Sequence, residues 1–64
     1  MKLNDLAVGE KFKSLEETGG FIYQKTNRID EFGSILCIDL PINHPFYESN
    51  DGHWHRKFEK VEKV

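Results

Sequence analysis

Short runs in which apolar and polar residues alternate, divided by glycine, proline and asparagine, recur along the chain. Alternate side chains of an extended strand point to opposite faces, so the alternation around Phe12 predicts a strand over residues 10–15. Gly19 and Gly20 mark a turn, and the β-branched and aromatic residues of 21–26 then predict a second strand. The first part of the chain therefore predicts two strands joined by a glycine turn.

The most apolar window of the chain, residues 34–40, is predicted to be a central strand. Ile35 and Cys37 would share one of its faces, and the apolar residues between and after them would share the other. Both faces are therefore expected to be at least partly covered. Pro41 ends this strand, because proline cannot donate a hydrogen bond to a sheet.

The segment after this central strand contains strong turn signals. Residues 41–45 include two prolines and are expected to be irregular, before an extended run at 46–48. The asparagine, aspartate and glycine at 50–52 tolerate the positive φ angles of a hairpin turn. Residues 53–58 are therefore predicted to pair back as a further strand.

Five strands separated by turn signals about ten residues apart are the pattern of a small β barrel. We predict that residues 1–64 form one all-β domain, a small five-stranded barrel or sandwich. At the C-terminal end Phe58, Val61 and Val64 are spaced three apart, which predicts a bulge or a short helical turn rather than strict alternation.

The N-terminal part of the chain resembles a known kind of small protein. Residues 5–12, Asp-Leu-Ala-Val-Gly-Glu-Lys-Phe, are followed by a glycine-led strand that ends in Lys25 and Thr26. This pattern, over about the first 26 residues, resembles small bacterial and bacteriophage proteins that look like short SH3-like barrels. The resemblance implies an SH3-like fold and a bacteriophage setting, and it carries over no catalytic or binding residue. The loop at 41–51, with its two prolines, departs from the short turn expected there.

Length and composition limit how this domain can be stabilised. A chain of 64 residues buries only about 60% of the surface that its unfolded form exposes, so its stability is expected to be marginal. Cys37 is the one cysteine, which excludes an intrachain disulfide and leaves metal binding, self-association or good packing. Both a monomer and a homodimer are compatible with the sequence.

Charge and hydropathy bear on partners and on the cellular compartment. Nine basic and eleven acidic residues give a net charge of -2, which is too balanced to indicate a polyanion partner by bulk electrostatics. No apolar run is long enough to span a membrane, and the start of the chain has no signal-peptide pattern. An unpaired cysteine also fits a reducing compartment, so we expect a cytoplasmic protein without a membrane partner.

Two histidines on one predicted strand are a candidate metal pair. His53 and His55 flank Trp54, and residues two apart on a strand share a face, so both imidazoles could converge on one ion. His44 or Cys37 would have to complete the set. The alternative is that these are solvent-exposed strand histidines, or that they respond to pH without any metal. No zinc-binding spacing supports the pair, and we assign no metal site from the sequence.

Aromatic and basic residues also alternate on this strand. Trp54, Arg56 and Lys57 have the mixture that suits single-stranded nucleic acid, where bases stack on rings and cations follow phosphates. Glu48 and Asp51 lie near them in sequence and oppose such binding. The alternative is that Trp54 anchors the core and Arg56 lies along it.

The sequence carries no recognisable catalytic constellation. It has no serine in a nucleophile elbow and no glycine loop in a phosphate-binding context. Cys37 lies in an apolar strand, where a thiolate is disfavoured. Paired carboxylates at Glu16-Glu17 and Asp30-Glu31 lie in polar turns and are expected to be solvated. We therefore predict that the protein is not an enzyme and has no cofactor.

A stiff, aromatic loop is the strongest candidate for binding another protein. The loop at 41–47 carries apolar and aromatic groups between its prolines, next to the strand at 53–57. The predicted protein-binding residues are Ile42, His44, Phe46, Tyr47 and Trp54. The alternative is that Ile42 and Phe46 cover the open end of the barrel. The leading hypothesis is a non-enzymatic interaction module, encoded by a bacteriophage, that modulates a host or viral protein.

Overall fold

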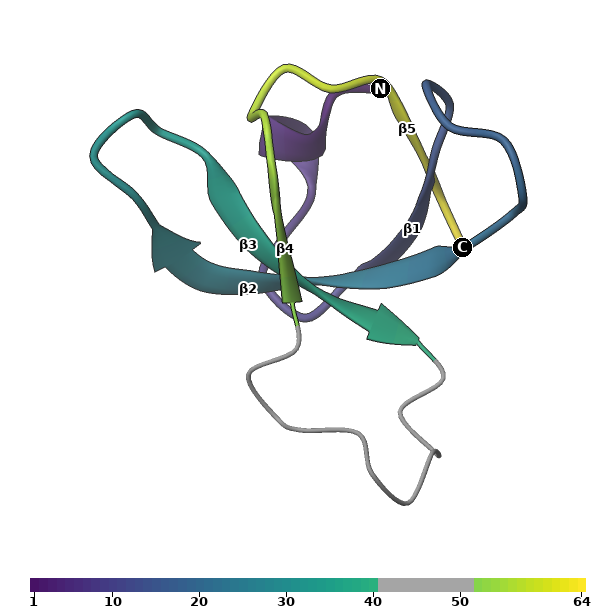
Figure 1. Ribbon diagram of the computed structural model, residues 1–64, viewed down its shortest axis with the longest axis horizontal. Helices are drawn as coiled ribbons and strands as arrows, with labels where there is room; N and C mark the ends of the chain where they lie inside the picture. The colour runs from purple at the N-terminus through teal and green to yellow at the C-terminus, as the bar shows by residue number, and fades with distance from the viewer. Residues whose placement is uncertain (41–51) are drawn as a thin grey trace.

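Five short strands form one antiparallel sheet in the computed structural model, which describes residues 1–40 and 52–64 (Figure 1). The strands are β1 (Lys11–Ser14), β2 (Ile22–Ile29), β3 (Ile35–Leu40), β4 (Gly52–His55) and β5 (Val61–Lys63). A 3₁₀ helix, η1 (Leu3–Asp5), precedes them. The strand order is β4-β3-β2-β1-β5, so β4 and β5 are the two edges of the sheet.

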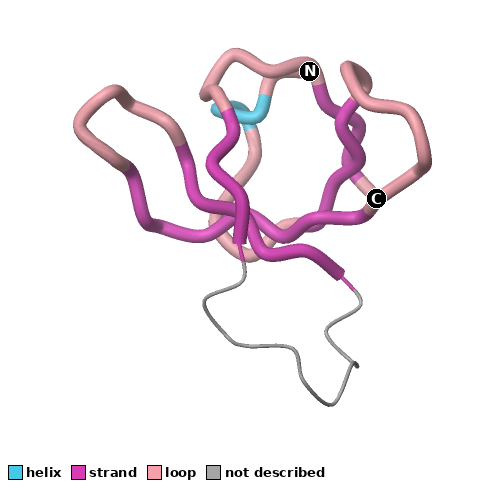
Figure 2. The backbone as a smooth tube through the Cα atoms, viewed as in Figure 1, coloured by secondary structure: helices cyan, strands magenta, loops and turns pink. Residues whose placement is uncertain are grey.

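The sheet is strongly bent, and its bend has a local cause. Lys25 lies opposite Cys37, but the next pair along the two strands is Ile29 and Ile35, so β2 has extra residues against β3. Such a bulge bends a strand and increases its twist. Figure 2, in the view of Figure 1, shows the result: the strands curve around η1, with β1 and β5 to the right of it. The sheet is not closed into a barrel by pairing of its two edges.

The core lies on the concave face of this sheet. Its buried apolar side chains are Leu3, Leu6, Phe12, Tyr23, Ile35, Cys37 and Val61. On β1 the burial alternates as predicted, with Phe12 and Ser14 inside and two lysines outside. Ile35 and Cys37 share the buried face of β3, which confirms the prediction for the central strand.

The C-terminal end is a strand and not the short helical turn that its residue spacing predicts. Val61 lies opposite Ser14 of β1 and is buried, whereas Phe58 and Val64 are exposed. The three-residue spacing arises because a turn, closed by a hydrogen bond from the Glu59 N–H to the Arg56 carbonyl, precedes β5. The one helical turn among the described residues is η1, at the other end of the chain.

The other predicted strands are confirmed in outline. β2 begins one residue after its predicted start and runs on to Ile29. The strand predicted at 53–58 is shorter and corresponds to β4, which begins at Gly52 and ends at His55. The extended run predicted at 46–48 lies outside the described residues. The fifth strand of the observed sheet is therefore β5, which the sequence did not indicate.

Candidate functional site

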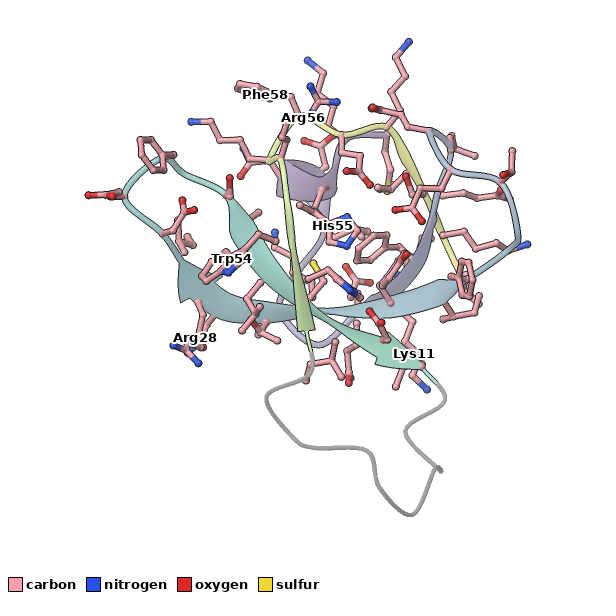
Figure 3. All side chains as sticks on the ribbon, in the orientation of Figure 1. Lys11, Arg28, Trp54, His55, Arg56 and Phe58 are labelled. Carbon is pink, nitrogen blue, oxygen red and sulfur yellow. The ribbon has the colours of Figure 1, made fainter. Side chains whose placement is uncertain are left out.

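The short edge strand β4 places its side chains on both faces of the sheet. Trp54 lies opposite Leu36 on the convex face and keeps 50% of its surface exposed. His55, the next residue, points into the concave face and is only 5% exposed. The interpretation of Trp54 as a core anchor is therefore wrong, because the neighbouring histidine occupies the buried position. Figure 3 shows the two side chains on β4.

Most of the predicted protein-binding residues cannot be placed against this surface. Ile42, His44, Phe46 and Tyr47 lie outside the described residues. Trp54 is the one member of that predicted set whose position the structure gives. The role of the 41–47 loop stays a prediction.

The two basic residues predicted to accompany Trp54 make local contacts instead. Arg56 Nη2 donates to Glu16 Oε1 at 2.9 Å. Lys57 Nζ lies 5.1 Å from the centre of the Phe58 ring, in a cation–π contact. Figure 3 shows Arg56 and Phe58 together at one end of β4, apart from Trp54. The described structure therefore does not gather the three residues into one cationic, aromatic strip.

A cluster of polar side chains, with His55 and Tyr23 buried and Glu17 exposed, lies beside β4. His55 Nδ1 contacts Glu59 Oε2 at 3.0 Å, and the Tyr23 hydroxyl donates to Glu17 Oε2 at 2.6 Å. The His55 ring meets the Tyr23 ring nearly edge to face, with ring centres 4.6 Å apart, and packs edge to face on Phe12 as well. These contacts explain why a histidine occupies the concave face, because it gains two aromatic neighbours and a carboxylate partner.

The Tyr23 hydroxyl is held in its protonated form. Burial is the largest cause of a raised Tyr23 pKa, and the hydrogen bond to Glu17 raises it further. Because Tyr23 keeps its proton at neutral pH, its hydroxyl is a fixed donor to the Glu17 carboxylate.

His53 and His55 share the concave face, as predicted, but they contact different carboxylates. His53 Nδ1 contacts Asp39 Oδ1 at 2.8 Å, at an exposed position. His55 instead contacts Glu59 in the interior. The two imidazoles therefore belong to separate polar groups among the described residues.

Two acidic residues expected to be solvated make specific contacts across the chain. Glu16 accepts hydrogen bonds from Arg56 and from the backbone N–H of Lys60. Glu17 accepts from Tyr23. Both residues are exposed, as expected. Their partners, however, lie on segments up to 44 positions away, and sequence proximity gives no sign of them.

Lys25 is a buried cation that the sequence analysis did not single out as a functional or structural group. Its Nζ donates to the backbone carbonyls of Leu3 and Leu6, at 3.2 and 2.5 Å. These bonds attach β2 to η1 and to the residue that follows η1. Tyr23 and Lys25 are two residues apart on β2, so a buried Tyr23 indicates that Lys25 also points inward. This spacing is the sequence feature from which the buried lysine could have been predicted.

Cys37 is fully buried, as expected for a small core residue. Burial is the main cause that raises its pKa to about 12, and the charge of Glu59 adds to the effect. The side chain is therefore a thiol at neutral pH and a poor nucleophile.

Comparison of the chain with protein-family models, with curated proteins and with solved structures finds no match. Among the described residues, no helix is both long and apolar enough to cross a membrane. The function of this protein is therefore inferred from its own side chains.

Proposed function

We propose that this domain is a non-enzymatic protein-interaction module that binds an extended segment of a partner protein along β4, with Trp54 as the anchor. The observation that carries the proposal is a half-exposed tryptophan on an edge strand of the sheet. Edge strands accept partner strands through main-chain hydrogen bonds, and tryptophan is over-represented among the residues that dominate binding energy.

The surroundings of Trp54 support an apolar contact. Leu36 lies directly opposite it on β3, and Ile38, further along the same face, lies opposite Gly52. Both β3 residues are only partly buried. Gly52 adds no side chain to this face, and Leu36 Cδ1 lies 3.0 Å from where its Cβ would be. The apolar surface next to Trp54 is therefore formed by residues of β3.

The buried thiol of Cys37 supports a binding role over catalysis, since its raised pKa disfavours the nucleophilic form. We further infer that the bent sheet belongs to a small SH3-like barrel of bacterial or bacteriophage origin, as the resemblance of residues 5–12 implies. The five short antiparallel strands, with the first paired to the last, support this fold. An unpaired, buried cysteine supports a place in the cytoplasm.

Binding of single-stranded nucleic acid through Trp54, Arg56 and Lys57 is the second candidate. The observation in its favour is the exposed Trp54 ring, on which a base could stack. The ion pair between Arg56 and Glu16 weakens it, because a carboxylate beside the cation repels phosphate. Protein binding is therefore the better supported proposal.

An affinity pull-down from bacterial lysate, with matched variants as baits, tests the proposal. Trp54→Ala removes the anchor, and Phe58→Ala removes an equally exposed aromatic ring away from the proposed surface. We expect proteins that bind the wild type and Phe58→Ala, with or without nuclease, to be lost with Trp54→Ala. Circular dichroism of each bait checks that it remains folded.

Two other outcomes of this experiment decide against the proposal. If Trp54→Ala retains the same proteins as the wild type, Trp54 is not the anchor. If retention disappears after nuclease treatment and weakens steeply with salt, nucleic-acid binding takes first place.

A further inference from the structure

Three side chains of the polar cluster beside β4 are suited to bind a metal ion. One ligand atom each from Glu17, His55 and Glu59 lies within 4.8 Å of the other two. We propose that these three residues bind a divalent transition-metal ion, with Zn²⁺ as the first candidate.

The hydrogen bonds of the cluster leave acceptors in excess of donors. The two carboxylates offer four oxygens, whereas the Tyr23 hydroxyl and one His55 ring nitrogen are the donors that contact them. The other ring nitrogen, His55 Nε2, is buried and has no hydrogen-bond partner among residues 1–40 and 52–64. Buried polar atoms are normally satisfied, and an unsatisfied one indicates a missing water or ion. The imidazole therefore has bonding capacity that the described protein atoms do not use.

The charges of the cluster also favour a bound cation. Two glutamates lie close together around one histidine, and the side chain of Glu59 is largely removed from solvent. Other nearby cations have different partners, since Lys25 binds backbone carbonyls and Arg56 binds Glu16. A divalent cation would neutralise the two carboxylates.

The three residues come from two parts of the chain, because His55 and Glu59 are only four positions apart. Glu17 lies in the turn between β1 and β2, His55 ends β4, and Glu59 lies in the turn before β5. A bound ion would therefore attach the turn between β1 and β2 to the segment that joins β4 to β5. For a domain of 64 residues whose one cysteine excludes an intrachain disulfide, this is an effective way to gain stability.

The ligand types indicate which ions fit. One imidazole nitrogen with two carboxylates suits zinc and other first-row transition ions, whereas calcium and magnesium prefer oxygen ligands alone. Glu17 is the exposed member of the set, so its side chain can adjust to the ion at little cost.

Zinc binding by the chelator-treated protein, followed by calorimetry and by thermal unfolding, tests this proposal. We expect one Zn²⁺ per chain and a rise in melting temperature that grows with free zinc. Glu17→Gln removes a ligand charge but leaves an acceptor for the Tyr23 hydroxyl, so the variant should fold. Its zinc affinity should fall by more than about tenfold, since even outer partners of metal ligands contribute that much.

Two control variants separate this site from adventitious binding. Glu16→Gln changes the neighbouring carboxylate, and His53→Gln changes the exposed histidine on the same face. Both should bind zinc as the wild type does. The proposal is wrong if zinc has no effect up to millimolar concentration, or if Glu17→Gln binds it unchanged. Loss of binding in His53→Gln alone would assign the zinc to the surface.

Discussion

At the scale of single residues, Cys37 makes the stability of the domain sensitive to alkaline pH. Burial raises its pKa in the folded state to about 12, against about 8.5 in an unfolded chain. Above pH 8.5 the unfolded state therefore loses the thiol proton first, and the free energy of unfolding falls as the pH rises. Below pH 8.5 both the folded and the unfolded state hold the proton, and the contribution of Cys37 to the free energy of unfolding has its full value.

The variant Cys37→Ala should lack this part of the alkaline loss. Urea unfolding at pH 7.5 and pH 9.5 measures the difference between the two proteins. We expect the wild type to lose about 1 kcal/mol more than Cys37→Ala over this interval, from the linkage of proton binding to folding. Equal losses in the two proteins would mean that Cys37 is accessible to hydroxide in the folded state.

Residue patterns predicted which side chains share a face, but not always which face is inside. In the strand predicted over 21–26, alternate side chains share a face, so Tyr23 and Lys25 lie together, and both are buried. On β4, hydrophobicity favours Trp54 as the inward residue, yet His55 is inside. The buried position of His55 depends on its contact with Glu59 and on the rings of Phe12 in β1 and Tyr23 in β2. The ring contacts arise only in the folded protein.

At the scale of elements, the pairing of β3 with β4 depends on the absence of a side chain at Gly52. A Cβ added there would lie 2.8 Å from the Cys37 carbonyl oxygen and 3.0 Å from Leu36 Cδ1. The first contact is with backbone in the middle of β3, which cannot move without disturbing the sheet. Gly52 therefore permits the close approach of the edge strand, a role different from the hairpin turn that the sequence suggested.

Gly52→Ala should destabilise the domain by about 1–3 kcal/mol, the usual cost of overpacking. Thermal unfolding measures this loss, and amide hydrogen exchange should show the greatest change in β3 and β4. Thr18→Ala, a change in an exposed turn, provides the matched control. A Gly52→Ala protein as stable as this control would show that β4 can shift away from β3 without cost.

The strands with strong local signals were predictable, whereas β5 was not. β2 and β3 contain dense β-branched and aromatic sequence, and both lie close to their predicted bounds. β5 has only three residues, and its place depends on pairing with β1, far away in the sequence. The candidate metal site could not be predicted for the same reason, because the fold and not a sequence motif brings Glu17 and Glu59 together.

At the scale of the whole molecule, the two ends of the chain hold each other in place. Val61 is buried, its N–H donates to the Met1 carbonyl, and the Leu3 N–H donates to the Glu59 carbonyl. Lys2 also forms an isolated bridge with Lys60. The core beneath β1 is therefore completed only when residues about 60 positions apart have met. Contacts of this separation tie the stability of one edge of the sheet to the folding of the whole chain.

Val61→Ala should therefore weaken the entire domain by about 1–3 kcal/mol, from lost apolar burial and the space left behind. The informative readout is Trp54 fluorescence, because Trp54 lies on β4, at the opposite edge of the sheet from β5. In a cooperative domain, unfolding curves from fluorescence and far-ultraviolet circular dichroism shift together to lower denaturant concentration. Val64→Ala, at an exposed neighbouring position, should leave both curves unchanged. If Val61→Ala shifts only the circular dichroism curve, the two edges unfold separately, and the curved sheet is not one cooperative unit.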